Sequence, residues 1–129
     1  MSDSRVVLDT NILVSALLTP SGNPARILKM FLSGGITLVY CEEILLEYRE
    51  VLYRFRPEIS MDDVDIVLAA IMLHGELIEV VPSTGTMIDE DDRVFYDVAK
   101  TASAFLITGN KKHFPHESFI LSPAQFFEP

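Results

Sequence analysis

The stretch from residue 5 to residue 13 constrains the fold more than any other part of the chain. Three apolar residues, Val6–Leu8, are followed at once by an acid, Asp9, and then by a second apolar run, Ile12–Leu18. A short run with two β-branched members is typical of a strand buried on both faces of a parallel sheet. Ligands bind at the carboxyl ends of the strands in open α/β sheets, so Asp9 lies where a functional acid is expected. A simple helix cap is the alternative role for this side chain.

Strand-like and helix-like segments alternate along the whole chain. Short apolar runs predict strands over residues 5–9, 36–40, 77–81, 105–108 and 119–121. Apolar residues at helical spacing predict helices over residues 10–18, 24–32, 42–55, 64–73 and 92–103, with a last helical turn at 123–127. Such alternation implies parallel pairing and right-handed crossovers, so the sequence predicts an α/β fold with all carboxyl strand ends on one edge.

The excess of acidic residues limits the classes of function that the sequence allows. The 129 residues include 10 basic and 19 acidic ones, for a formal net charge of −9. A basic footprint for nucleic acid is missing, which counts against a passive nucleic-acid binder. It counts less against an enzyme that holds a divalent cation between its acids and its substrate. The one cysteine, Cys41, cannot form an internal disulfide, and we find neither a secretory signal nor a membrane-length apolar run, so we expect a cytoplasmic protein.

Other polar side chains return to the edge at which Asp9 is expected. Asn110 follows the fourth predicted strand, and Glu47 lies at the border of the apolar stripe of helix 42–55. Asp92 ends the acidic run 89–92 at the start of the next helix. Clustered carboxylates need a compensating charge, and an oxygen-only ligand set suits Mg²⁺ or Mn²⁺ better than zinc. On spacing alone, a set of helix caps explains the same acids equally well.

Four stretches, in order, resemble the motifs of the PIN-domain ribonucleases, and most closely the VapC-like subgroup described as toxins of bacterial and archaeal toxin–antitoxin pairs. These stretches are Val7–Ser15, Glu43–Tyr48, Asp89–Phe95 and Leu106–Phe114. The resemblance implies one PIN-like domain over residues 1–129, a three-layer α/β/α fold around a central, mainly parallel five-stranded sheet. It also implies a Mg²⁺- or Mn²⁺-dependent endoribonuclease that hydrolyses RNA phosphodiester bonds. The expected partners are an RNA substrate, a cognate antitoxin and a second copy of the chain in a homodimer.

The resemblance also assigns the site residues, position by position. The expected catalytic and metal-binding residues are Asp9, Glu47, Asp92 and Asn110. The residues expected to support them by hydrogen bonds are Thr10, Asn11, Thr108 and Asp91. The basic residues expected to contact RNA phosphates are Arg93, Lys111 and Lys112, although each taken singly is more simply an ordinary solvated charge. Asn110 stands where the family commonly has a fourth acid, and this departure leaves one or two bound metals as alternatives.

Two other classes of function stay open at this point. A catalytically weak interaction protein would keep the fold, while Asn110 and the acidic surface weaken RNA binding. A metal-dependent phosphatase would use the same edge for small substrates. Incubation with single-stranded RNA and Mn²⁺ distinguishes the three.

Overall fold

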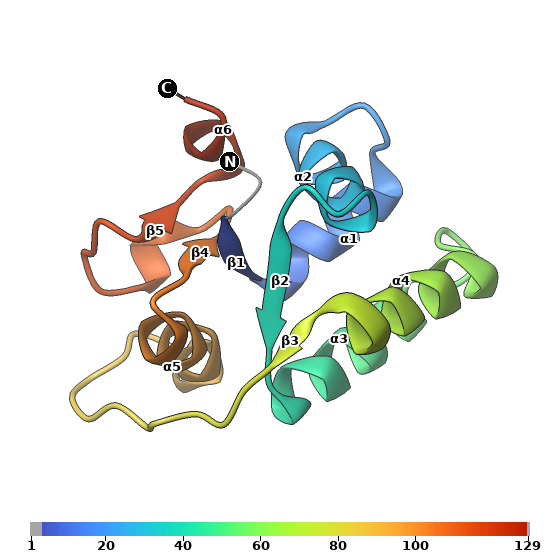
Figure 1. Ribbon diagram of the computed structural model, residues 1–129. Helices are drawn as coiled ribbons and strands as arrows, with labels where there is room; N and C mark the ends of the chain where they lie inside the picture. The colour runs from blue at the N-terminus through green and yellow to red at the C-terminus, as the bar shows by residue number, and fades with distance from the viewer. Residues whose placement is uncertain (1–3, 129) are drawn as a thin grey trace.

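A five-stranded parallel sheet forms the centre of the computed structural model, which describes residues 4–128 (Figure 1). The strands are β1 Arg5–Leu8, β2 Thr37–Tyr40, β3 Glu76–Leu77, β4 Phe105–Ile107 and β5 Ile120–Leu121. Their order is β3-β2-β1-β4-β5, and every neighbouring pair is parallel. The predicted mainly parallel sheet with five strands is therefore confirmed, with β1 at its centre. The polar start of the chain, residues 1–3, lies outside the described residues, and the single domain over residues 1–129 stays a prediction.

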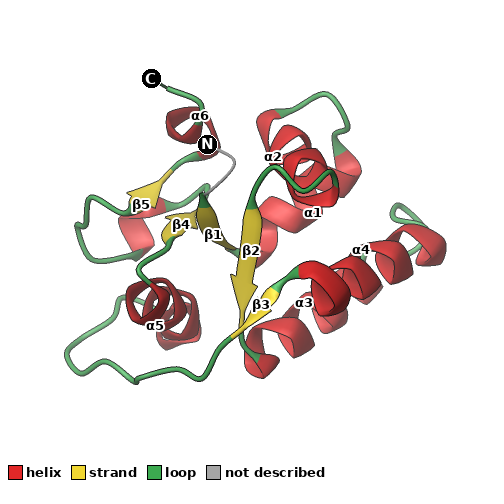
Figure 2. Ribbon diagram, in the orientation of Figure 1, coloured by secondary structure: helices red, strands yellow, loops and turns green. Residues whose placement is uncertain are grey.

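Helices cover both faces of this sheet (Figure 2). They are α1 Thr10–Leu18, α2 Asn23–Leu32, α3 Glu42–Arg54, α4 Met61–His74, α5 Arg93–Ala102 and α6 Pro123–Phe126, with 3-10 turns η1 Glu90–Asp92 and η2 Lys111–His113. The crossovers from β1 to β2 to β3 run in one direction along the sheet, and the crossover from β3 back to β4 runs in the other. Right-handed connections therefore place α1–α4 on one face and α5 on the opposite face, as Figure 1 shows. The predicted three-layer architecture is confirmed. No helix within residues 4–128 combines the length and apolar character needed to cross a membrane.

The central strand is packed from both sides. Val6, Val7 and Leu8 have no exposed surface, as expected for an apolar run between two helical layers. Tyr48 of α3 is also fully buried, and its hydroxyl donates a hydrogen bond to the Leu8 carbonyl at 2.5 Å. This bond fixes the middle of α3 against the end of β1, directly before Asp9. The strand and the helix that carry two of the predicted site acids are thus joined by a buried contact.

We expect Tyr48→Phe to destabilise the fold by about 1–3 kcal/mol, because the Leu8 carbonyl loses its hydrogen-bond donor inside the core. Chemical denaturation, followed by circular dichroism, measures this loss. Tyr53→Phe, on the same helix but only half-buried, serves as the control and should change the free energy of unfolding by less than about 0.5 kcal/mol. Equal losses in the two variants would contradict the anchoring role of Tyr48.

The third strand is shorter than the sequence predicts. The apolar run predicts a strand over residues 77–81, whereas β3 covers only Glu76–Leu77. The strand lies at the edge of the sheet, and its neighbour β2 ends at Tyr40 because the chain turns into α3. The Ile78 N–H donates the last bond across this pair, to the Tyr40 carbonyl at 3.0 Å. Strand length is set here by the partner, and the sequence of the strand itself does not contain that information.

Candidate active site

Asp9 lies at the middle of the carboxyl edge, directly after β1. Its backbone N–H donates to the Ile107 carbonyl at 3.0 Å, so the pairing of β1 with β4 sets its position. The hydroxyl of Thr108, which has no exposed surface, donates to Asp9 Oδ2 at 2.8 Å. Asp9 is only 9% exposed, and this burial raises the pKa of its carboxyl, while the hydrogen bond from Thr108 opposes the shift. Asp9 is also the N-cap residue of α1, and the backbone N–H groups of Thr10 and Asn11 lower the pKa of its carboxyl.

Glu47 reaches the same edge from α3. The wheel of this helix predicts a border position for Glu47, and its side chain is half-buried. The hydroxyl of Thr10 donates a hydrogen bond to Glu47 Oε2. Burial raises the pKa of the Glu47 carboxyl, the Thr10 hydrogen bond lowers it, and the negative charges of Asp9 and Asp91 raise it further. Asp9 and Glu47 therefore act electrostatically on each other, and each accepts a threonine hydroxyl.

Asp92 approaches from the opposite helical layer, at the end of η1 and the start of α5. Its Oδ2 is buried, and the one contact of this atom within residues 4–128 is His113 Nδ1 at 3.5 Å, an ion pair when the imidazole is protonated. Burial raises the pKa of the Asp92 carboxyl, the charges of Asp9 and Asp89 raise it further, and His113 opposes them. A carboxylate oxygen that accepts no close hydrogen bond and lies beside other acids is an atom that a hard cation would bind.

Asn110 is joined to this group through Thr108 and His113. Its backbone N–H donates to Thr108 Oγ1 at 3.0 Å, and Thr108 in turn donates to Asp9. Its side-chain amide nitrogen lies 3.0 Å from His113 Nε2. The sequence places His113 with Lys111 and Lys112 in the loop after Asn110 but gives it no role among the acids. The missing signal is the 3-10 turn η2, in which side chains three residues apart lie on the same face.

Arg93 is held by the protein itself. Its guanidinium donates to Glu90 Oε2 at 2.7 Å, to Ser83 Oγ at 2.9 Å and to the Gly85 carbonyl at 2.5 Å. The hydrogen bond from Arg93 lowers the pKa of Glu90. These bonds tie the segment 83–90 to the first turn of α5, next to Asp92. The predicted contact of Arg93 with RNA phosphates stays untested, while its bonds give it a second role as a positioning residue for the acidic segment.

The remaining predicted residues lie at the surface. Asn11 is exposed on α1, and Asp91 is exposed with its backbone N–H donating to Asp89 Oδ1 at 3.0 Å. Lys111 donates from Nζ to Gln125 Oε1 at 2.9 Å, and Lys112 is exposed beside it. The structure thus brings the four predicted ligands to one edge together with Thr10 and Thr108, and it places the side chains of Asn11 and of the lysines outside their hydrogen-bond network.

We expect Arg93→Gln to release the segment 83–90 from α5, because glutamine cannot replace the donors to three separate partners. Amide hydrogen exchange, read by mass spectrometry, should become on the order of tenfold faster in this segment. Arg54→Gln, an exposed arginine at the end of α3, is the matched control. Unchanged exchange in Arg93→Gln would show that the segment is held by other contacts.

The acids do not form a finished coordination sphere. Within residues 4–128, no group of three or more His, Cys, Asp or Glu side chains is arranged closely enough to hold a metal ion. The donor chemistry nevertheless fits a hard divalent cation, since the carboxylates of Asp9, Glu47 and Asp92 act electrostatically on one another at one edge and Asp92 Oδ2 accepts no close hydrogen bond.

Comparison with known proteins identifies the family of this chain. Residues 5–112 match the PIN domain family, so the chain belongs to this family, whose members are generally nucleases that use divalent metals. Over 110 residues the chain is 30% identical to the Uncharacterized protein MJ1680 of Methanocaldococcus jannaschii. This match covers 83% of this chain and 71% of that protein.

Two solved structures share the fold. The first is a chain of VapBC2 from Rickettsia felis, solved in complex with a DNA fragment from the promoter of that pair. It superposes with a TM-score of 0.60 at 20% identity, and the match covers 92% of this chain and 97% of that chain. PAE2754 from Pyrobaculum aerophilum superposes with a TM-score of 0.58 at 13% identity, covering 98% of this chain and 93% of that chain. At these identities the likeness concerns the fold alone.

Proposed function

We propose that this chain is a metal-dependent endoribonuclease and the toxin of a toxin–antitoxin pair. The observation that supports the enzyme most strongly is the convergence of Asp9, Glu47 and Asp92 on one edge of the sheet. They come from three different elements, and burial raises the pKa of each. Such a set of acids is costly to the fold and is typical of a functional site.

Each residue has a defined task in this proposal. The carboxylates of Asp9, Glu47 and Asp92 hold Mg²⁺ or Mn²⁺, and Asn110 assists with its carbonyl oxygen, directly or through water. The ion supplies a water of lowered pKa and stabilises the charge of the phosphodiester during hydrolysis. Thr108 and Thr10 each occupy one oxygen of Asp9 and Glu47, which orients the carboxylates toward the edge.

The substrate is proposed to be single-stranded RNA, held at its phosphates from the loop after β4. Lys111 and Lys112 follow Asn110 directly and bring positive charge to an edge that is otherwise acidic. In a chain with a net charge of −9, local cations and the bound ion must offset the repulsion between protein and RNA.

The test is incubation of the pure protein with labelled single-stranded RNA and Mn²⁺. We expect cleavage that EDTA abolishes and that Asp9→Asn removes, while Asp65→Asn, an exposed acid on α4, leaves it intact. Hydrolysis of small phosphomonoesters with the RNA left whole would assign the chain to the phosphatases. If the protein hydrolyses neither substrate and metal does not stabilise it, the catalytically weak interaction protein would be the one remaining function.

The toxin role is tested in cells. We expect induced expression of the chain to stop growth, Asp9→Asn to relieve this arrest, and the product of a short neighbouring reading frame to relieve it and to co-purify with the chain. VapBC2, the pair with the similar fold, was crystallised as a complex on promoter DNA. Unimpaired growth during strong expression of an active nuclease would separate the nuclease from the toxin role. A homodimer is also proposed, and light scattering of the pure chain tests it.

A further inference from the structure

The imidazole of His113 lies between two of the proposed metal ligands, Asn110 and Asp92. The turn η2 begins directly after Asn110, and the His113 backbone N–H donates to the Asn110 carbonyl at 3.0 Å. This turn brings the two side chains to the same face. Asn110 Nδ2 lies 3.0 Å from His113 Nε2 and 3.2 Å from Nδ1, and Nδ1 lies 3.5 Å from Asp92 Oδ2. The ring therefore contacts both proposed ligands.

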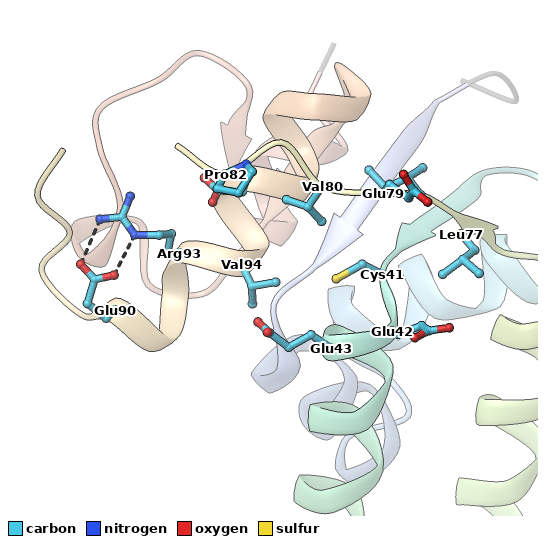
Figure 3. A pocket seen from close by; sticks show the side chains of 12 residues that line it. Cys41, Glu42, Glu43, Leu77, Glu79, Val80, Pro82, Glu90, Arg93 and Val94 are labelled. Carbon is cyan, nitrogen blue, oxygen red and sulfur yellow. Dashed lines mark hydrogen bonds and ion pairs between the residues drawn. The ribbon is translucent and has the colours of Figure 1, made fainter. Parts of the chain in front are cut away.

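The basic residues next to these ligands in the sequence are engaged elsewhere. Figure 3 shows the guanidinium of Arg93 bonded to Glu90, at 2.7 Å to Oε2 and 2.9 Å to Oε1. Lys111 Nζ donates to Gln125 Oε1 at 2.9 Å. Among the basic side chains that the structure describes, His113 alone contacts a proposed ligand. Its place between the two ligands is therefore specific to the site.

The side chain of Asn110 has two chemically different ends. The amide nitrogen of a carboxamide only donates hydrogen bonds, whereas the carbonyl oxygen accepts them and binds hard cations. Rotation about the last side-chain bond exchanges the two ends. An aspartate has two equivalent oxygens and presents one of them in either orientation. An asparagine is therefore a usable ligand in only one of its two orientations.

The contact with His113 selects one orientation of this carboxamide. The nitrogen end of Asn110 is turned toward the ring, where the ring nitrogen without a proton accepts a hydrogen bond from it. The tautomer with its proton on Nδ1 serves both contacts, because Nδ1–H then faces Asp92 and Nε2 accepts from Asn110. Asn110 Oδ1 accepts no hydrogen bond within residues 4–128, so the oxygen is the free end.

We propose that His113 is a positioning residue, which holds the amide nitrogen of Asn110 and leaves its carbonyl oxygen available to a bound divalent cation. This inference rests on the proposed metal centre, and it explains how an asparagine serves where the family commonly has an acid. It has one specific consequence. With Asn110→Asp, the two carboxylate oxygens are equivalent, so there is no orientation for His113 to select.

The hydrogen bond itself is tested without metal. The full chain, labelled with ¹⁵N, is studied by nuclear magnetic resonance in EDTA. We expect a scalar coupling between Asn110 Nδ2 and a ring nitrogen of His113, because such a coupling is transmitted only through a hydrogen bond. The exposed His116, in the same loop, should show no coupling to Asn110. Absence of the His113 coupling would overturn the proposal, whatever the affinity of the chain for metal.

The consequence for metal binding is tested by calorimetry with Mn²⁺ on the full chain. We expect His113→Leu to weaken Mn²⁺ binding about tenfold, and the control His116→Leu to leave it unchanged. His113→Gln keeps an oxygen that accepts from Asn110 Nδ2, so its affinity should stay within about twofold of the natural one. In the Asn110→Asp chain, His113→Leu should not weaken the binding.

The outcomes separate the role of His113 from the metal centre. Equal weakening by His113→Leu in the Asn110 and Asn110→Asp chains would overturn the proposal, because His113 would then act through Asp92 or through the fold. Normal Mn²⁺ binding by His113→Leu would overturn it as well, and would leave the metal centre intact. If the natural chain shows the coupling but binds no Mn²⁺, the metal centre itself is refuted, and the positioning role with it.

Discussion

Asp9→Asn is expected to reduce RNA cleavage by about a thousandfold or more and, at the same time, to stabilise the metal-free protein. The loss follows from the position of Asp9 at the meeting point of the acids, since a bound metal supplies several kcal/mol of stabilisation to the reacting phosphodiester. The gain follows from burial, which raises the pKa of Asp9 and makes its charge unfavourable in the folded state. Asparagine keeps an oxygen that accepts the Thr108 hydroxyl.

Thermal unfolding in EDTA measures the second effect. We expect the Tm to rise by roughly 2–5 °C at pH 7, which corresponds to about 1 kcal/mol in a chain of this size. Asp65→Asn on the surface of α4 should leave the Tm unchanged. A lower Tm for Asp9→Asn would show that this carboxylate is a structural element and not a functional one.

The pH dependence has a definite sign. Because the pKa of Asp9 is raised on folding, the folded state binds more protons than the unfolded chain between the ordinary and the raised pKa. The stability of the natural protein therefore falls as the pH rises through this range. The advantage of Asp9→Asn should be smallest below the ordinary carboxyl pKa and reach its full size above the raised one. Difference curves of Tm against pH for the two proteins measure this.

Gly75→Ala is expected to destabilise the fold by about 3 kcal/mol. A Cβ at this position would lie 2.6 Å from the Ile71 carbonyl oxygen, 2.9 Å from Tyr40 Cε1 and 3.1 Å from the Leu38 carbonyl oxygen. Two of these atoms belong to backbone, so they cannot move aside without a shift of α4 against β2. The backbone of Gly75 has a φ of −73°, which any residue adopts, so the effect is one of space alone.

Urea denaturation measures this effect, with Gly109→Ala as the matched control. A Cβ at Gly109 meets nothing within 4 Å, so this variant should change the free energy of unfolding by less than about 1 kcal/mol. Similar midpoints for the two variants would contradict the close approach of α4 and β2 at Gly75.

Local patterns were sufficient for much of this fold. The apolar run before Asp9 correctly predicted a strand buried on both faces. A strand that is covered by helices on both sides has apolar residues at consecutive positions, and this pattern is visible in the sequence. The helical wheel of α3 placed Glu47 at the border of the buried stripe, and its side chain is half-buried.

Features that depend on distant partners were not predictable. The length of β3 depends on where β2 ends, and the burial of Asp97 depends on the segment at Ser83 that crosses it. The approach of His113 to Asp92 requires both the η2 turn and the packing of α5. Each of these features depends on a contact between segments that are distant in the sequence. The sequence of either segment alone does not indicate that contact.

Anomalous scattering from Mn²⁺ locates a divalent cation bound at the carboxyl edge. Crystals of the protein soaked in Mn²⁺ should show an anomalous difference peak within coordination distance of Asp9, Glu47 and Asp92. The same peak should be absent from crystals of Asp9→Asn. A peak bound by other residues, or no peak at this edge in the natural protein, would contradict the proposed metal centre.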